Sequence, residues 1–228
     1  MKPTTKGRRT TSHKPGDIYF GEYVRFSTSD KKVGAALAGP DNAVGDIGTI
    51  GFVLDDSKRQ VAWLKNPYGQ LVGFLNNHDS YNAAVMAAKG WELHYVLSFT
   101  AYSEEPEPGE YWGQVALIAF APRYAEEFNV FLKAFAKAAG DGSRPDPKLS
   151  NDSIVSVLAN PAEWKPSSKI KIPRGGGRTA ILKDHRSVHD SMLDAARSKK
   201  VGCYIVSWAF ILAVVTLVVW ALHKFGLF

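Results

Sequence analysis

The feature that most restricts what this chain can fold into is an uncharged stretch near its C-terminus, residues 201–222 of KKVGCYIVSWAFILAVVTLVVWALHK. As a helix, these residues extend about 33 Å, against roughly 30 Å of bilayer hydrocarbon. Twelve of them are Val, Ile, Leu or Phe, which together favour membrane insertion by roughly −4 to −7 kcal/mol. The stretch contains no proline. It therefore predicts a transmembrane helix.

The alternative interpretation is a fully buried helix of a large soluble core. That interpretation needs other segments of similar apolarity, and the remaining 206 residues supply none. Tyr204 near one end and Trp220 near the other also suit the aromatic belts at the two membrane interfaces. Membrane insertion is the favoured prediction.

The charged residues beside the stretch predict its orientation, because positive charge is retained on the cytoplasmic side. One cation, Lys224, follows it, whereas five precede it within 20 residues: Lys183, Arg186, Arg197, Lys199 and Lys200. We therefore expect a tail-anchored, single-pass protein of the cell membrane, with its N-terminal domain in the cytoplasm. The basic N-terminus lacks the apolar run of a secretory signal, and the single cysteine, Cys203, excludes an intrachain disulfide.

The net charge of +6 is unevenly distributed. Residues 1–15 carry five cations and no acid, residues 17–139 have a net charge of −5, and residues 140–200 have a net charge of +5. The part that looks folded is thus mildly acidic, which is unlike a nucleic-acid-binding domain. Basic flanks beside a membrane span suit anionic lipid headgroups as partners. Nucleic-acid binding through an arm of Lys6, Arg8, Arg9 and Lys14 stays an alternative.

Local signals place most elements within residues 17–139. Two apolar runs flank Asn66-Pro67-Tyr68-Gly69, which predicts a β-hairpin with a type I turn. A helix should follow, with Asp79 as N-cap and Gly90 just after its end. Residues 91–102 alternate as a strand, with Trp91, Leu93, Tyr95, Leu97 and Phe99 on one face. Strands are also expected at 17–26, with Gly21 as a bulge, and at 49–56.

Residues 111–121 form a nearly continuous apolar run, so we expect a central strand covered on both faces. Pro122 should open a helix to Ala139 whose apolar residues share one stripe. The predicted fold is α+β: a small, mainly antiparallel β domain, which could be barrel-like, with two packed helices. The domain organisation has six parts: a basic arm (1–16), the α+β domain (17–139), a linker with a short helix and a flexible basic tether (140–186), a juxtamembrane helix (187–200), the transmembrane helix (201–222) and a short tail (223–228).

The stretch 60–121 resembles HIRAN domains. The resemblance is carried by VAWLKNPYGQLVGFL, by the KGWELHYVLSF that follows a short helix, and by the closing strand QVALIAF. It implies a small β-barrel-like module with one or two helices. It also implies that the domain binds DNA ends, and it assigns no binding residue.

The sequence contains no strong catalytic motif. PRGGGR (173–178) lacks the spacing of a phosphate-binding loop, and His185 and His189 share a helical face without a third metal ligand. No cofactor and no metal are expected. Trp63, Trp91 and Trp112 are most simply core residues, while Tyr68 at the hairpin tip is a candidate partner contact.

Three functions remain open. The first is a cytosolic binding module, confined to the membrane by its anchor, that binds a protein or a nucleotide-like ligand. The second is a membrane-tethered, HIRAN-like nucleic-acid-binding domain. The third is an enzyme with an unrecognised site around His78, Asp79 and His94. Ala209 and Ala213 form a small-residue pair through which two anchors would pack as a homodimer.

Overall fold

The computed structural model describes residues 17–105, 107–166, 168–173, 178–188, 190, 192, 210–212, 214–216 and 224. The chain divides into two compact units, Met1–Arg186 and Ser187–Phe228. The elements of the first unit are β1 (Tyr19–Ser27), α1 (Lys31–Ala36), β2 (Ile47–Leu54), β3 (Gln60–Lys65), β4 (Leu71–Leu75), α2 (Asn77–Ala88), β5 (Glu92–Ser103), β6 (Glu110–Phe120), η2 (Pro122–Tyr124), α3 (Ala125–Gly140), α4 (Asn151–Ala159), η3 (Pro161–Glu163) and β7 (Thr179–Lys183).

Six antiparallel strands close into a barrel. They are hydrogen-bonded in the order β2-β3-β4-β1-β6-β5, and β2 pairs in turn with β5. β7 pairs with β5 outside this closed ring and is the last strand of the sheet. The α+β class and the antiparallel β domain predicted from the sequence are therefore confirmed, and the domain is a closed barrel.

The barrel interior is apolar because alternate residues of each strand point inward. On β6, which pairs with β1 and β5, the inward residues are Val115, Leu117 and Ala119. Ala83 and Met86 of α2 belong to the same buried cluster. The β6 prediction is correct: its central apolar residues are buried, which a strand covered on both faces requires.

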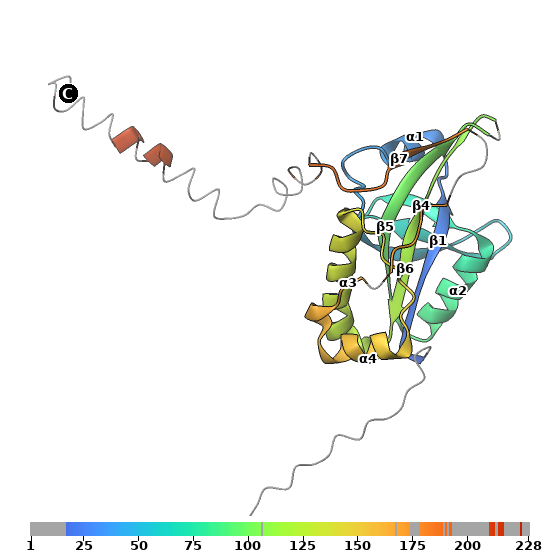
Figure 1. The fold of residues 1–228 in the computed structure, drawn as a ribbon. Helices are drawn as coiled ribbons and strands as arrows, with labels where there is room; N and C mark the ends of the chain where they lie inside the picture. Colours follow the sequence, from blue (N-terminus) through green and yellow to red (C-terminus); the bar gives the residue numbers. More distant parts are fainter. Residues whose placement is uncertain are drawn as a thin grey trace, which may run out of the picture. The chain divides into compact units, whose positions relative to one another are not determined.

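The outward residues of β6 are covered by α3. Ile118 and Phe120 pack in a second buried cluster with Phe128, Phe131 and Phe135 of α3. These α3 residues are buried, so the predicted apolar stripe is the face that meets the barrel. Figure 1 shows α2 and α3 on opposite sides of the barrel.

The β3–β4 hairpin forms at the predicted turn. The Gly69 amide donates to the Asn66 carbonyl at 2.9 Å, and Gly69 has a φ of +80°. The N-cap of α2 is Asn76 and not the predicted Asp79, since the Asn76 side chain accepts from the Asp79 amide at 2.9 Å. Asp79 thus lies in the first helical turn, where its negative charge interacts favourably with the helix dipole.

Phe99 does not share the inner face of β5 as the alternation predicted. Leu97 is opposite Val115 but Phe99 is opposite Gln114, so Ser98 is an extra residue in a β-bulge. The bulge reverses the alternation and turns Phe99 to the outside of the barrel. Gly21, predicted to be a bulge, instead keeps regular pairing with Ile118.

The segment 140–186, expected to be a linker with a short helix, contains that helix as α4, together with η3 and β7, and lies within the first unit. Its buried Ile154 and Val157 join the cluster under α3, and the Trp164 ring lies 4.9 Å from that of Phe131. The composition of this segment is linker-like, but these spaced apolar side chains are enough to pack it against the barrel. Its residues 174–177 are outside the described residues.

In the second unit, Ser187 and Asp190 form a reciprocal capping pair, with hydrogen bonds of 3.2 and 3.0 Å between side chain and backbone. Residues 210–212 and 214–216 are helical, and the Thr216 hydroxyl donates to the Leu212 carbonyl at 2.7 Å. The rest of the predicted span 201–222 lies outside the described residues. Within the described part of the chain, no helix is sufficiently long and apolar to cross a bilayer.

Candidate functional site

An apolar cleft of about 350 Å³ opens on the outer side of β5 and β6. Its lining residues come from β5, β6, β7 and the segment before β7: Phe99, Ala101, Trp112, Ile172, Pro173, Thr179 and Ile181. Phe99 is in the cleft because the bulge at Ser98 turns it outward. The Phe99 and Trp112 rings meet edge to face, with centroids 5.5 Å apart.

The polar atoms at the cleft already have partners. The Trp112 indole N–H donates to Ser103 Oγ at 2.8 Å, and Ser103 Oγ lies 2.9 Å from Thr179 Oγ1. This chain of hydrogen bonds joins β6, β5 and β7 and fixes the Trp112 ring. An apolar group entering the cleft would therefore leave no lining donor newly unpaired.

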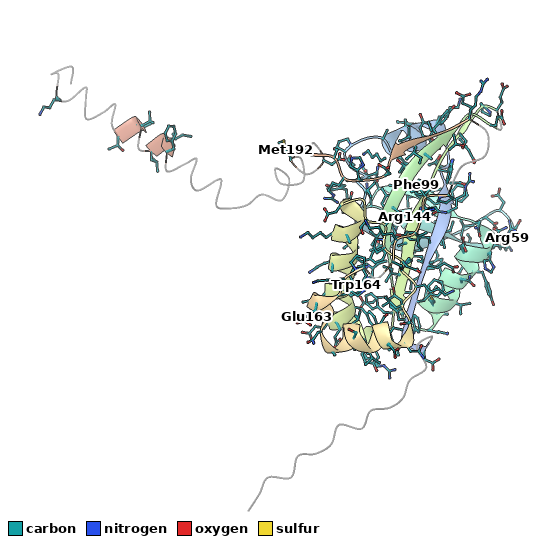
Figure 2. The ribbon with its side chains drawn as sticks, viewed as in Figure 1. Arg59, Phe99, Arg144, Glu163, Trp164 and Met192 are labelled. Carbon is teal, nitrogen blue, oxygen red and sulfur yellow. The ribbon has the colours of Figure 1, made fainter. Side chains whose placement is uncertain are left out.

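The Arg144 side chain contacts the aromatic rings of Tyr23 and Phe99. Its guanidinium lies 4.4 Å from the Tyr23 ring centroid and 5.3 Å from that of Phe99 (Figure 2). It donates to the Lys171 carbonyl at 3.0 Å and to the Gln114 side chain. Burial lowers the pKa of Arg144, and the neighbouring Tyr23 acts in the opposite direction. Arg144 has a φ of +41°, a strained conformation for a residue other than glycine.

Cationic side chains also lie beside the cleft. The Arg25 guanidinium is 4.2 Å from the Trp112 ring centroid and pairs with Glu110. Arg178, next to Thr179 in the chain, pairs with Glu104 at 3.3 Å, and its side chain is 82% exposed. Both pairs are on the surface, where ion pairs contribute little to stability and exchange partners readily.

One wall of the cleft is the edge strand β7. In the part of the chain that the structure describes, the backbone of Ala180, Ile181 and Leu182 is bonded to no strand besides β5. Ile181 is 49% exposed and Leu182 is 39% exposed, and Leu182 is an extra residue relative to β5. An exposed apolar edge strand is a template for pairing with another chain.

Two of the cations predicted to flank the membrane anchor contact the barrel domain. Lys183 Nζ donates to the Gly39 and Asn42 carbonyls at 2.7 and 3.2 Å. Arg186 pairs with Asp46 and donates from Nε to the Val44 carbonyl at 3.2 Å. Lys224 is helical, and the remaining predicted residues lie outside those described: Arg197, Lys199, Lys200, Tyr204 and Trp220.

The residues suggested for an unrecognised active site make separate contacts. His94 on β5 stacks on Phe120 with centroids 5.6 Å apart, whereas His78 on α2 contacts Asn82 at 3.3 Å. Asp79 bonds Asn76. Tyr68 is 49% exposed at the β3–β4 turn. Among the described residues, no group of His, Cys, Asp and Glu is arranged to hold a metal ion.

Sequence reasoning missed Phe99, Arg144 and β7 as parts of one site. The alternation of β5 assigned Phe99 to the interior, because a bulge has no clear sequence signal. Arg144 stands in DGSRPDPK, whose composition resembles a linker. The available signal was the short apolar run TAILK between Arg178 and Asp184, which was too brief to stand out from its basic surroundings.

No protein-family model, no curated protein and no solved structure matches this chain.

Proposed function

We propose that this chain is a single-pass membrane protein, anchored near its C-terminus, that presents a cytoplasmic barrel domain for binding a partner protein. The anchor is the span 201–222. Its described residues support the proposal because they are helical and expose apolar side chains, with Phe210 69% and Leu212 59% exposed. Arg197, Lys199 and Lys200 keep the excess of positive charge on the N-terminal side.

The observation that carries the binding function is the exposed edge of β7 beside the apolar cleft. A partner segment in extended conformation adds to such an edge through backbone hydrogen bonds, and its side chains enter neighbouring pockets. Ile181 belongs to both features, since it lies on the edge strand and lines the cleft. We call the edge of β7 together with the cleft the β7 surface.

The cleft favours binding over catalysis. Among its described lining residues, two side chains carry a polar group: the Thr179 hydroxyl and the Trp112 indole. Both are hydrogen-bonded within the wall of the cleft. General acid–base chemistry needs a titratable group within reach of the substrate. A membrane-tethered enzyme around His78, Asp79 and His94 has less support, since these residues have different neighbours.

A nucleic-acid-binding function also has less support. Single-stranded nucleic acids stack their bases on accessible aromatic faces in a basic groove. Phe99 is 0% exposed and Trp112 is 4% exposed, so neither ring offers an open face. Residues 17–139, which form most of the barrel domain, are net acidic.

The anchor is tested by carbonate extraction of membranes from cells that express the full chain, followed by protease treatment from each side. We expect the protein in the membrane pellet and the barrel domain cut only from the cytoplasmic side. Recovery in the supernatant would refute the anchor, and cleavage of the domain from outside intact cells would refute its orientation.

Binding is tested by affinity capture of the full chain from detergent extracts that also contain a second, differently tagged copy. Ile181→Glu places a charge on the β7 surface and should abolish the capture of partner proteins by the tagged chain. Val155→Glu is the matched control, because Val155 is 66% exposed on α4, away from this strand. Identical capture by both variants would refute binding at the β7 surface.

A further inference from the structure

We propose that the barrel domain docks on anionic lipid headgroups through three exposed lysines of the segment before β7. They are Lys165, Lys169 and Lys171, which we call the lysine patch. Residues 164–183, to which they belong, carry six cations and no acid. This inference goes beyond the proposed function, because it concerns the membrane surface and not the partner protein, and it rests on the proposed anchor.

The fold holds the lysines on the outer side of this segment. Lys169 pairs in an antiparallel bridge with the segment that follows α3, and the Ile170 amide donates to the Arg144 carbonyl at 3.1 Å. The Lys171 carbonyl in turn accepts from the Arg144 guanidinium at 3.0 Å. Alternate residues of an extended segment face opposite sides. Ile170 and Ile172 are half-buried, whereas Lys169 and Lys171 are exposed.

The lysine patch lacks counter-charges. Within the described part of the chain, none of its three ammonium groups forms an ion pair. The arginines beside the cleft differ, since Arg25 pairs with Glu110 and Arg178 pairs with Glu104. Like charges without partners repel one another, and an anionic surface offsets this repulsion.

The distribution of charge selects the side of the domain that meets the lipid. Residues 17–139, with a net charge of −5, are repelled by an anionic surface, whereas the lysine patch is attracted. The domain should therefore turn the lysine patch towards the bilayer. Each lysine near an anionic membrane shifts the ratio of docked to free domain by about fivefold, and three together shift it by about a hundredfold.

The membrane anchor makes so weak a contact sufficient. Residues 187–200 connect Arg186 to the predicted span and reach about 50 Å when fully extended. Arg186 itself is held on the barrel domain, because its amide donates to the Gly140 carbonyl at 2.8 Å. The bilayer is therefore present at a high effective concentration for the barrel domain, and a few cations are enough to dock it.

Fluorescence quenching by lipid reports the docking directly. In a Cys203→Ala background, Ser168→Cys carries a fluorophore within the lysine patch, and Tyr81→Cys, at a residue 68% exposed on α2, carries it as the control. The full chain is reconstituted into phosphatidylcholine vesicles with headgroup spin labels, with or without phosphatidylserine. We expect quenching at residue 168 only with phosphatidylserine. This quenching should be lost between about 0.1 and 1 M salt, because the Debye length falls from about 10 to 3 Å.

Substitution of the lysines tests the patch itself. Glutamine at all three positions should lower the ratio of docked to free domain about a hundredfold. The matched control removes the same charge from three other exposed lysines, on α1, the β2–β3 turn and α3: Lys32→Gln/Lys58→Gln/Lys133→Gln. It should retain most of the docking. Circular dichroism and thermal melting of each variant show whether the barrel domain remains folded.

The outcomes separate this inference from the function beneath it. Absent quenching, equal quenching without phosphatidylserine, or an equal loss in the matched control would each overturn the lipid contact. If quenching were absent while the glutamine variant lost its captured proteins in detergent, the lysines would bind an acidic protein instead. Quenching at residue 168 in a chain that carbonate releases would refute the anchor alone. Quenching together with undiminished capture by Ile181→Glu would refute only binding at the β7 surface.

Discussion

The outer side of the β1–β6–β5 wall is covered in two different ways along its length. Towards the β6 C-terminus, α3 lays Phe128, Phe131 and Phe135 over Ile118 and Phe120, and all five are fully buried. Towards the β6 N-terminus, the wall is covered by the irregular segment 141–150 between α3 and α4. Arg144 of this segment stacks between Tyr23 and Phe99. The same strands therefore carry a sealed region, which we call the α3 region, and an open one, which we call the cleft region.

The difference follows from what each cover can supply. A helix satisfies its own backbone and presents a continuous apolar stripe, so nothing polar needs to face the wall. The carbonyl groups of the irregular segment need hydrogen-bond donors, because they are not bonded within a helix. Tyrosines of the wall supply them: Tyr19 and Tyr23 donate to the Pro147 and Pro145 carbonyls at 2.7 and 2.8 Å. The α3 region is therefore filled by apolar side chains, whereas the cleft region leaves a cleft of about 350 Å³.

Truncation of a large ring in the α3 region gives the largest expected effect. Phe131→Ala should lower the free energy of unfolding by about 3–5 kcal/mol, because Phe131 is fully buried against Tyr19, Phe135 and Trp164. Urea unfolding of the full chain in detergent micelles, followed by tryptophan fluorescence, measures it. Val155→Ala on the exposed side of α4 is the control and should change little. A loss of less than about 1 kcal/mol for Phe131→Ala would show that α3 does not seal the barrel.

Enlargement of a side chain distinguishes the two regions more sharply. Ala116 and Ile181 both lie outside the barrel interior, but Ala116 is 0% exposed under α3, whereas Ile181 is 49% exposed at the cleft. Ala116→Phe should cost about 1–3 kcal/mol through overpacking, whereas Ile181→Phe should cost less than about 1 kcal/mol because its additional ring atoms extend into open space. Equal losses in urea unfolding would mean that the cleft is not open space in solution.

The α3 region was predictable from the sequence because its signal is periodic. The stripe of Phe128, Phe131, Leu132 and Phe135 appears at helical spacing, and the apolar run of β6 indicates a strand buried on both faces. The β3–β4 hairpin was equally clear from its turn residues, which favour few other conformations. These features depend on local patterns.

The cleft region was not predictable because its causes are not local. The bulge at Ser98 depends on how β5 pairs with β6, and the position of Arg144 depends on contacts with Tyr23 and Lys171, far away in the sequence. β7 pairs with residues 100–103 of β5, beyond the residues 94–96 at which β5 pairs with β2. A basic, glycine-rich segment gives no indication of such a partner.

The smallest expected effect concerns the ionisation of Tyr23 in the cleft region. Burial raises the pKa of Tyr23, and it outweighs the opposing effect of the Arg144 guanidinium; Asp146 raises the pKa further. The folded state therefore favours the protonated phenol, so this stabilisation is complete below the unfolded pKa of about 10 and is lost as the pH rises through the folded value.

Tyr23→Phe removes the hydrogen bond to Pro145 and should cost about 0.5–1.5 kcal/mol at pH 8. Above pH 10 its stability should fall less steeply than that of the wild type, although buried Tyr19 and Tyr95, whose pKa values burial also raises, maintain part of the slope. Urea unfolding between pH 8 and 11 measures both changes, with Tyr81→Phe on the exposed side of α2 as the control. Parallel pH profiles for Tyr23→Phe and the wild type would show that the phenol of Tyr23 is solvated and that the irregular segment does not cover it.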